Sequence, residues 1–222
     1  MHADWTELTE CVDSYLDASE GVDNRRYFYM TFLREPVARY VSEFLHVQRG
    51  ATWSDTQYMC GGESGLSHMV PCYESDDWEG VSLDQFNGCT TNMAFNRQTR
   101  MLADLRLVHC YNDTAMPAGD RDRAMLASAK ANLRNMAFFG MTARQAESQL
   151  LFEQTFKLKF KVDFETEDQQ SEAYDPTREE TQRIRQLNSL DIELYNFALD
   201  LLQERYQAAV KSAETAVATI AA

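Results

Sequence analysis

Several features that mark other protein classes are absent from this 222-residue chain. No run of 18 or more apolar residues occurs, so no segment is expected to span a bilayer. Met1 is followed at once by His2-Ala3-Asp4, without the basic and apolar regions of a secretory signal peptide. Basic residues are few, with 21 Lys and Arg against 35 Asp and Glu. The resulting net charge of −14 argues against a nucleic-acid binder, which would carry a basic face.

Two kinds of site signature are also missing. None of the five cysteines falls in a CxxC pair or another metal-ligand spacing, so no metal site is predicted. The chain has no Gly-x-x-x-x-Gly-Lys loop of the kind that cradles phosphates, and its one Gly-Gly pair, Gly61-Gly62, is not followed by lysine. If this chain binds a nucleotide, no such loop is expected to hold the phosphates.

The most informative segment runs from Tyr27 to Ser42. Its first seven residues are apolar and rich in aromatics, which predicts a buried strand. Pro36 then stands where a helix can begin, because its fixed φ and missing N–H cost nothing at the first helical position. An arginine between strand and helix, Arg34, is typical of an anion site in an open α/β sheet, helped by the helix N-terminus. The hydroxyl of Ser42 could join it on one phosphate; the alternative is that Arg34 only forms a salt bridge with a neighbour.

The remaining chain alternates between predicted strands and helices. Strands are expected at 27–33, 106–111, 136–139 and 158–162. Helices are expected at 6–16, 36–48, 92–103, 120–133 and 176–187, from a Ser82–Gln85 capping box, from a Thr142–Gln145 cap to about 156, and from Ser189 onward. Residues 50–80 and 163–176 are expected to be loops. The alternation predicts one α/β domain, with a parallel sheet flanked by helices.

The cysteines leave their oxidation state open. Cys60 and Cys72 bracket a Gly- and Ser-rich loop that a disulfide could close, and Cys89 and Cys110 could form a second bridge. Cys11 would then be left over. Five reduced, buried cysteines are the alternative, and four cysteines alone allow three connectivities.

Five segments of the chain resemble the heparan sulfate 6-O-sulfotransferases. They are HADWTEL at 2–8, FLREPVARYVSEFLHVQRGATW at 32–53, NRQTRMLADL at 96–105, NLRNMAFFGMT at 132–142 and LLFEQTFKLKF at 150–160. The similarity covers roughly residues 2–162 and continues more weakly through the tail. It implies a P-loop-like sulfotransferase fold as a single domain over 1–222, with an acidic loop and C-terminal helices after residue 162. It also favours disulfides over reduced cysteines, because the family works in the Golgi lumen as type II membrane proteins.

The resemblance implies an activity and a set of site residues. Members of this family transfer a sulfuryl group from 3′-phosphoadenosine 5′-phosphosulfate to the 6-hydroxyl of glucosamine in heparan sulfate. His2 occupies the position of the catalytic base, and Arg34 with Ser42 matches the 3′-phosphate site. His46 and Trp53 match saccharide contacts, and the adenine is expected at Thr155-Phe156-Lys157. From sequence alone, a frayed terminus, a surface imidazole and a packed indole are the alternatives for His2, His46 and Trp53.

The chain departs from the family in one respect. Members carry, ahead of the HADW segment, a strand and a Gly/Thr-rich phosphate loop with a lysine, and neither occurs here, nor does the family's membrane anchor. The first strand and the phosphate loop are therefore expected to be missing from this sheet, and its edge to be exposed. Two readings remain: a catalytic domain incomplete at its N-terminus, or a non-catalytic module that binds a glycan or a nucleotide on the same scaffold.

One further expectation concerns charge. Despite the net charge of −14, a local basic cleft for a sulfated polysaccharide is possible, because fields focus locally. The arginines that could line it are Arg25, Arg26, Arg34, Arg39, Arg49, Arg97 and Arg100. Scattered solvated charges are the alternative.

Overall fold

A computed structural model describes residues 3–21, 27–51, 56, 58–70, 72, 78–164 and 174–220. At its centre, β1 (Met30–Leu33) pairs in parallel with β4 (Phe138–Met141), so that Met30 lies opposite Phe138 and Leu33 opposite Met141. All four residues of β4 are buried, as expected for a strand covered on both faces. The parallel pairing is thus confirmed for these two strands, but β1 is shorter than the predicted strand 27–33 and, apart from Leu33, is not buried. Strand β4 begins and ends two residues later than the predicted 136–139.

A helix follows each strand of this sheet. Helix α3 (Pro36–Gln48) has the predicted bounds and follows β1, and α7 (Gln145–Phe156) follows β4. Two residues separate β1 from α3, and three residues separate β4 from α7. Consequently α3 and α7 both begin at the edge of the sheet where the two strands end.

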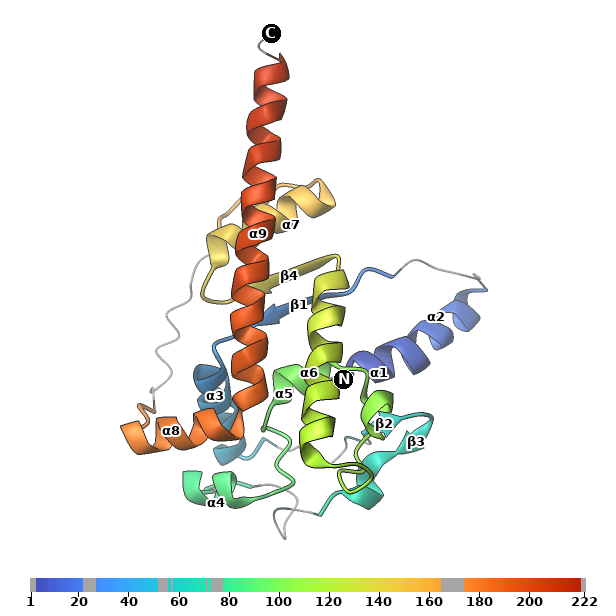
Figure 1. Ribbon diagram of the computed structural model, residues 1–222, viewed down its shortest axis with the longest axis vertical. Coiled ribbons are helices and arrows are strands. Elements are labelled where there is room, and N and C mark those ends of the chain that lie inside the picture. Colours follow the sequence, from blue (N-terminus) through green and yellow to red (C-terminus); the bar gives the residue numbers. More distant parts are fainter. Residues whose placement is uncertain are drawn as a thin grey trace.

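Two long helices cover the sheet. Helices α6 (Ala118–Asn135) and α9 (Ser189–Ile220) run side by side, and the C-terminal end of α9 projects beyond α7 (Figure 1). Small and branched residues bury the contact, among them Ala129 and Leu133 of α6 and Leu194 and Ala198 of α9. No helix in the described ranges has both the length and the apolar character needed to cross a membrane.

A second apolar core lies under α3. The rings of Tyr40 and Phe44 pack 5.3 and 5.6 Å from that of Phe86 in α4 (Leu83–Gly88). Ile184 of α8 (Arg178–Leu187) completes this core and is wholly buried. The predicted Ser82–Gln85 capping box opens α4 as expected.

The N-terminal segment is one continuous helical stretch. It consists of α1 (Trp5–Glu7), a π-helical turn η1 (Leu8–Val12) and α2 (Asp13–Glu20), which extends the predicted helix at both ends. Aromatic residues ahead of β1 hold it: the Trp5 and Tyr29 rings lie 4.9 Å apart, and the Tyr27 hydroxyl donates to Asp17 at 2.6 Å. The helical stretch therefore packs against the entry to the central sheet.

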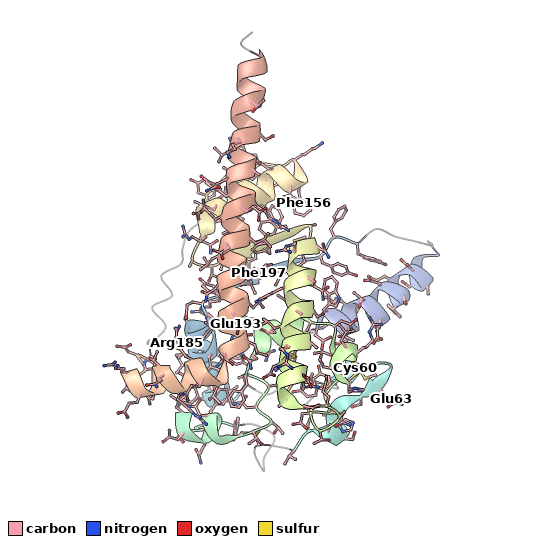
Figure 2. All side chains as sticks on the ribbon, in the orientation of Figure 1. Cys60, Glu63, Phe156, Arg185, Glu193 and Phe197 are labelled. Atoms are coloured by element: carbon pink, nitrogen blue, oxygen red, sulfur yellow. A yellow bond between two sulfur atoms is a disulfide. The ribbon has the colours of Figure 1, made fainter. Side chains whose placement is uncertain are left out.

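The chain around the cysteines is irregular and crosslinked. Short strands β2 (Met59–Cys60) and β3 (Glu63–Ser64) are antiparallel, and 3₁₀ turns η2 (Gly65–His68) and η3 (Leu105–Val108) follow. Disulfides join Cys60 (labelled in Figure 2) to Cys110 and Cys72 to Cys89, with Cα–Cα distances of 5.8 and 5.6 Å. The sequence left the pairing open, and the two bridges it suggested, Cys60–Cys72 and Cys89–Cys110, are not the ones present. Cys11 is free.

Three predicted elements differ in the structure. Residues 106–111 form no strand; η3 and a turn stand there, because Asp104 caps the turn by accepting from the Arg106 N–H at 3.1 Å. Residues 158–162 form no strand either, and the Phe160 N–H donates instead to Glu153 of α7 at 2.9 Å. Helix α5 (Arg97–Leu102) is shorter than the predicted 92–103.

The start of α7 also differs from the prediction. Thr142 does not cap this helix, because its N–H continues the β ladder by donating to the Leu33 carbonyl at 2.9 Å. The N-cap residue is Arg144, which makes no capping side-chain hydrogen bond.

Candidate functional site

Arg34 stands at the edge where both strands of the sheet end. It follows β1 directly, two residues before α3 begins, and its side chain is exposed. In α/β sheets, ligands bind outside the carboxyl ends of the strands. An exposed guanidinium at this edge is positioned to bind an anionic group.

The N-terminus of α3 contributes less to anion binding than the sequence suggested. Pro36 has no N–H, and the Ala38 N–H donates to the carboxylate of Glu35 at 2.8 Å. The chain's own carboxylate thus occupies the first turn and opposes the positive end of the helix dipole. Recognition of an anion at this edge therefore depends on the Arg34 side chain.

The main chain of Arg34 is held by a side chain 64 residues away in sequence. The Arg34 N–H donates to Oε1 of Gln98 at 2.9 Å, and Nε2 of Gln98 donates to the Arg34 carbonyl at 3.0 Å. One carboxamide thus pairs with both main-chain groups of one residue, as a neighbouring strand would.

Helices α5 and α9 cap each other next to this contact. Asp191 of α9 accepts from the N–H groups of Gln98 and Thr99 at 3.1 and 2.8 Å. In return, Oδ1 of Asn96 accepts from the N–H groups of Leu190 and Asp191 at 3.0 and 3.3 Å. Asn96 has φ 47°, in the left-handed region that asparagine tolerates better than most residues. Each helix therefore supplies the N-terminal acceptor of the other.

Arginines that might have lined a basic cleft are instead paired within the fold. Arg39 donates to Glu43 at 2.7 Å and to Asn188 at 2.6 Å, and it lies 3.5 Å from the buried carboxylate of Asp191. Arg97 reaches the other oxygen of Glu43 at 2.7 Å. We refer to Arg34, Gln98, Asn96, Asp191 and these paired residues as the polar junction.

Arg100 is also bonded within the fold. Its guanidinium donates to the main-chain carbonyls of Met93 and Phe95, and burial lowers its pKa. Arg39, Arg97 and Arg100 are therefore engaged by partners within the fold, whereas a basic cleft was only one of the two possibilities left by the sequence. Arg34 and Arg49 are exposed, and Arg25 and Arg26 lie outside the described residues.

The other predicted residues near this edge follow along α3. Ser42 is half-buried, and His46 is exposed one turn further along the same face. The chain reverses after α3, where the Ala51 N–H donates to the His46 carbonyl at 3.2 Å. His2 and Trp53 lie outside the described residues.

The predicted adenine contacts stand elsewhere. Thr155, Phe156 and Lys157 end α7, and the ring of Phe156 lies 6.4 Å from that of Phe28, ahead of β1 (Figure 2). Phe28 and Arg34 are six residues apart, roughly 20 Å along an extended chain. The structure thus places Ser42 and His46 on the helix that follows Arg34, and it places Thr155–Lys157 at the C-terminal end of α7.

Asp4, in the HADW segment, is buried beside Tyr111, which follows the disulfide-bonded Cys110. Its carboxylate accepts from the Glu7 N–H at 2.9 Å and from the Tyr111 hydroxyl at 2.8 Å. Burial raises the pKa of Asp4 in spite of these bonds. Asp4 therefore anchors the start of the described chain to Tyr111.

Comparison with known proteins places this geometry in a family. The Sulfotransferase family matches residues 9–198. The chain belongs to this family. It is 50% identical to heparan-sulfate 6-O-sulfotransferase 2 of Danio rerio over 93% of its own length and 46% of that protein. It is 48% identical to heparan-sulfate 6-O-sulfotransferase 1 and 50% identical to heparan-sulfate 6-O-sulfotransferase 3, both of Homo sapiens, over 52% and 45% of those proteins. The chain spans about half the length of these curated relatives.

Membership of the sulfotransferase family confirms the resemblance drawn from the five sequence segments. The structure, in addition, identifies residues that the sequence analysis missed. Gln98 and Asn96 lie in the quoted NRQTR segment, whose side chains hold Arg34, α5 and α9 together. Asp191 lies in the last helix and carried no sequence signal, because its partners are more than 90 residues away.

Proposed function

We propose that this sulfotransferase-family protein transfers a sulfuryl group from 3′-phosphoadenosine 5′-phosphosulfate to the 6-hydroxyl of glucosamine units in heparan sulfate. The names and 48–50% identity of the relatives support this substrate pair. The structural observation that carries it is Arg34, exposed at the carboxyl edge of the parallel strands with its main chain held on both sides. We also propose that the protein acts in the Golgi lumen.

In this proposal Arg34 binds the 3′-phosphate of the donor. Its planar, permanently charged guanidinium can make paired charge-assisted hydrogen bonds, and Ser42 adds a neutral donor from α3. Sulfuryl transfer needs the leaving group and the acceptor in line, as phosphoryl transfer does. Fixing the register of the nucleotide at its 3′-phosphate therefore orients the sulfuryl group at the other end.

Two histidines and one aromatic ring are proposed to act on the acceptor saccharide. A neutral imidazole at His2 would take the proton of the sugar hydroxyl as it attacks. His46, exposed on α3 behind Ser42, would hydrogen-bond the saccharide, and Trp53 would stack on it. Thr155–Lys157 stays a prediction for adenine contacts.

The test is sulfuryl transfer by the longest natural form of the protein from labelled donor to 6-O-desulfated heparan, with the product position read by disaccharide analysis. Arg34→Ala is expected to lower kcat/KM for the donor by about 10- to 150-fold, because a charge-assisted hydrogen bond contributes about 1.5–3 kcal/mol. Arg185→Ala removes an exposed arginine on α8 and serves as the matched control (Figure 2).

Two outcomes would contradict the proposal. An Arg34→Ala protein with wild-type kcat/KM would exclude the 3′-phosphate role. A wild-type protein that binds the nucleotide but transfers no label would instead favour the non-catalytic binding module.

A further inference from the structure

The β ladder ends one residue before Arg34. The last bond of the ladder runs from the Thr142 N–H to the Leu33 carbonyl at 2.9 Å. The next donor and acceptor along the chain are those of Arg34, and both bond to the Gln98 carboxamide at 2.9 and 3.0 Å. Gln98 therefore pairs with the main-chain groups of the first residue after the ladder, which point away from β4.

Gln98 is itself held rigidly. It lies in the first turn of α5, where its own N–H and that of Thr99 donate to Asp191. The Asp191 side chain is wholly buried, and the Thr99 hydroxyl donates to it at 2.8 Å. The main chain from which the carboxamide extends is thus fixed by the contact of α5 with Asp191 of α9.

We propose that Gln98 is a positioning residue for the nucleotide's 3′-phosphate, which it serves by fixing the main chain of Arg34. The inference rests on the proposed function, in which Arg34 binds that phosphate. Arginine carries a large rotamer entropy, and an anchored main chain lowers the cost of ordering its guanidinium on a ligand. A carboxamide suits this task because it offers one donor and one acceptor in the same plane.

The experiment compares two nucleotides by calorimetry on the longest natural form of the protein: adenosine 3′,5′-bisphosphate and adenosine 5′-phosphate. Gln98→Met keeps the length and helix preference of glutamine but removes both bonds. It is expected to weaken the bisphosphate about tenfold and to leave the monophosphate unchanged. Gln98→Glu keeps an acceptor for the Arg34 N–H, so a loss of about threefold with the same selectivity is expected.

Asn132→Leu is the matched control. Its carboxamide donates to the Leu102 carbonyl at 2.8 Å, at the opposite end of α5 from Gln98. This variant loses a similar bond between a side-chain amide and the main chain and therefore tests for a merely structural effect. Both nucleotides should bind to it as they bind to the wild type.

A double-mutant cycle with Arg34→Ala separates the inference from the proposed function. In the Arg34→Ala background, Gln98→Met should cause no further loss of bisphosphate affinity. Equal weakening of both nucleotides by Gln98→Met, no weakening, or an undiminished effect without Arg34 would overturn the positioning role while Arg34 keeps its own. If Arg34→Ala itself leaves the preference for the bisphosphate intact, the proposed function fails and this inference fails with it.

Discussion

The polar junction and the chain around the four paired cysteines, Cys60, Cys72, Cys89 and Cys110 (the cysteine-bearing chain), are fixed by different means. In the junction, the carboxamide of Gln98 and the carboxylate of Asp191 bridge segments more than 60 residues apart. In the cysteine-bearing chain, two disulfides close loops with sequence separations of 50 and 17 residues. The junction therefore depends on the hydrogen bonds and ion pairs of a few side chains, and the cysteine-bearing chain depends on oxidation of its cysteines.

Removing the buried carboxylate of the junction should have the largest effect on stability. Asp191→Ala leaves the N–H groups of Gln98 and Thr99 without their acceptor and Arg39 without a partner 3.5 Å away. Breaking a buried pair from one side typically costs about 3–5 kcal/mol. Urea denaturation of the variant should show a loss of free energy of unfolding in that range.

Asp200→Ala, an exposed aspartate in the same helix, is the control for this change. It should shift the free energy of unfolding by less than about 0.5 kcal/mol. If Asp191→Ala were as mild as this control, the junction would not be held by its buried charge.

The difference between local and distant partners also decides what the sequence could predict. Pro36 and the Ser82–Gln85 box act within one turn, so α3 and the start of α4 were predicted correctly. The pairing of Gln98 with Arg34 needs two segments 64 residues apart to meet, and no local pattern encodes it. The position of Arg34 between a strand and a helix could be predicted, because these elements follow one another directly in the sequence.

Incorrect strand predictions have a related cause. Residues 158–162 alternate like a strand, but Val162 is 71% exposed and none of the described strands pairs with this segment. Glu153 and Gln149 of α7 accept from the N–H groups of Phe160 and Phe164 instead. Periodicity alone cannot tell a strand from an extended segment that lies along a helix.

Opening the longer crosslink is expected to be the next largest effect. Replacing Cys60 and Cys110 together by serine removes a loop closure over 50 residues, and losses of about 2–4 kcal/mol are typical. The measurement is the midpoint of urea unfolding with and without reductant. Reductant should lower the wild-type midpoint and should lower that of the double variant by less, because only Cys72–Cys89 remains.

Peptide masses from a non-reduced digest check the pairing itself. They should show Cys60 linked to Cys110 and Cys72 linked to Cys89. Cys11→Ser, at a free and exposed position, should leave the midpoint unchanged. Crosslinked peptides joining Cys60 to Cys72 would restore the pairing expected from sequence and contradict the structure.

The smallest expected effect is a pH dependence at Asp4, which ties the HADW segment to Tyr111 beside Cys110. Burial raises the pKa of Asp4 above its ordinary value of 3.8, so the folded protein holds this proton more tightly than the unfolded chain does. The stability that follows is fully present below pH 3.8 and is lost as the pH rises through the folded-state pKa. Asp4→Asn has nothing to ionise and should not show this loss.

The measurement is the free energy of unfolding of both proteins from pH 3.5 to pH 7. The wild type should lose stability relative to Asp4→Asn as the pH rises, and the difference should level off once Asp4 is ionised in both states. Asp200→Asn is the control for the change of aspartate to amide at an exposed position. Parallel curves for wild type and Asp4→Asn would mean that the bonds from Glu7 and Tyr111 offset the cost of burying the charge.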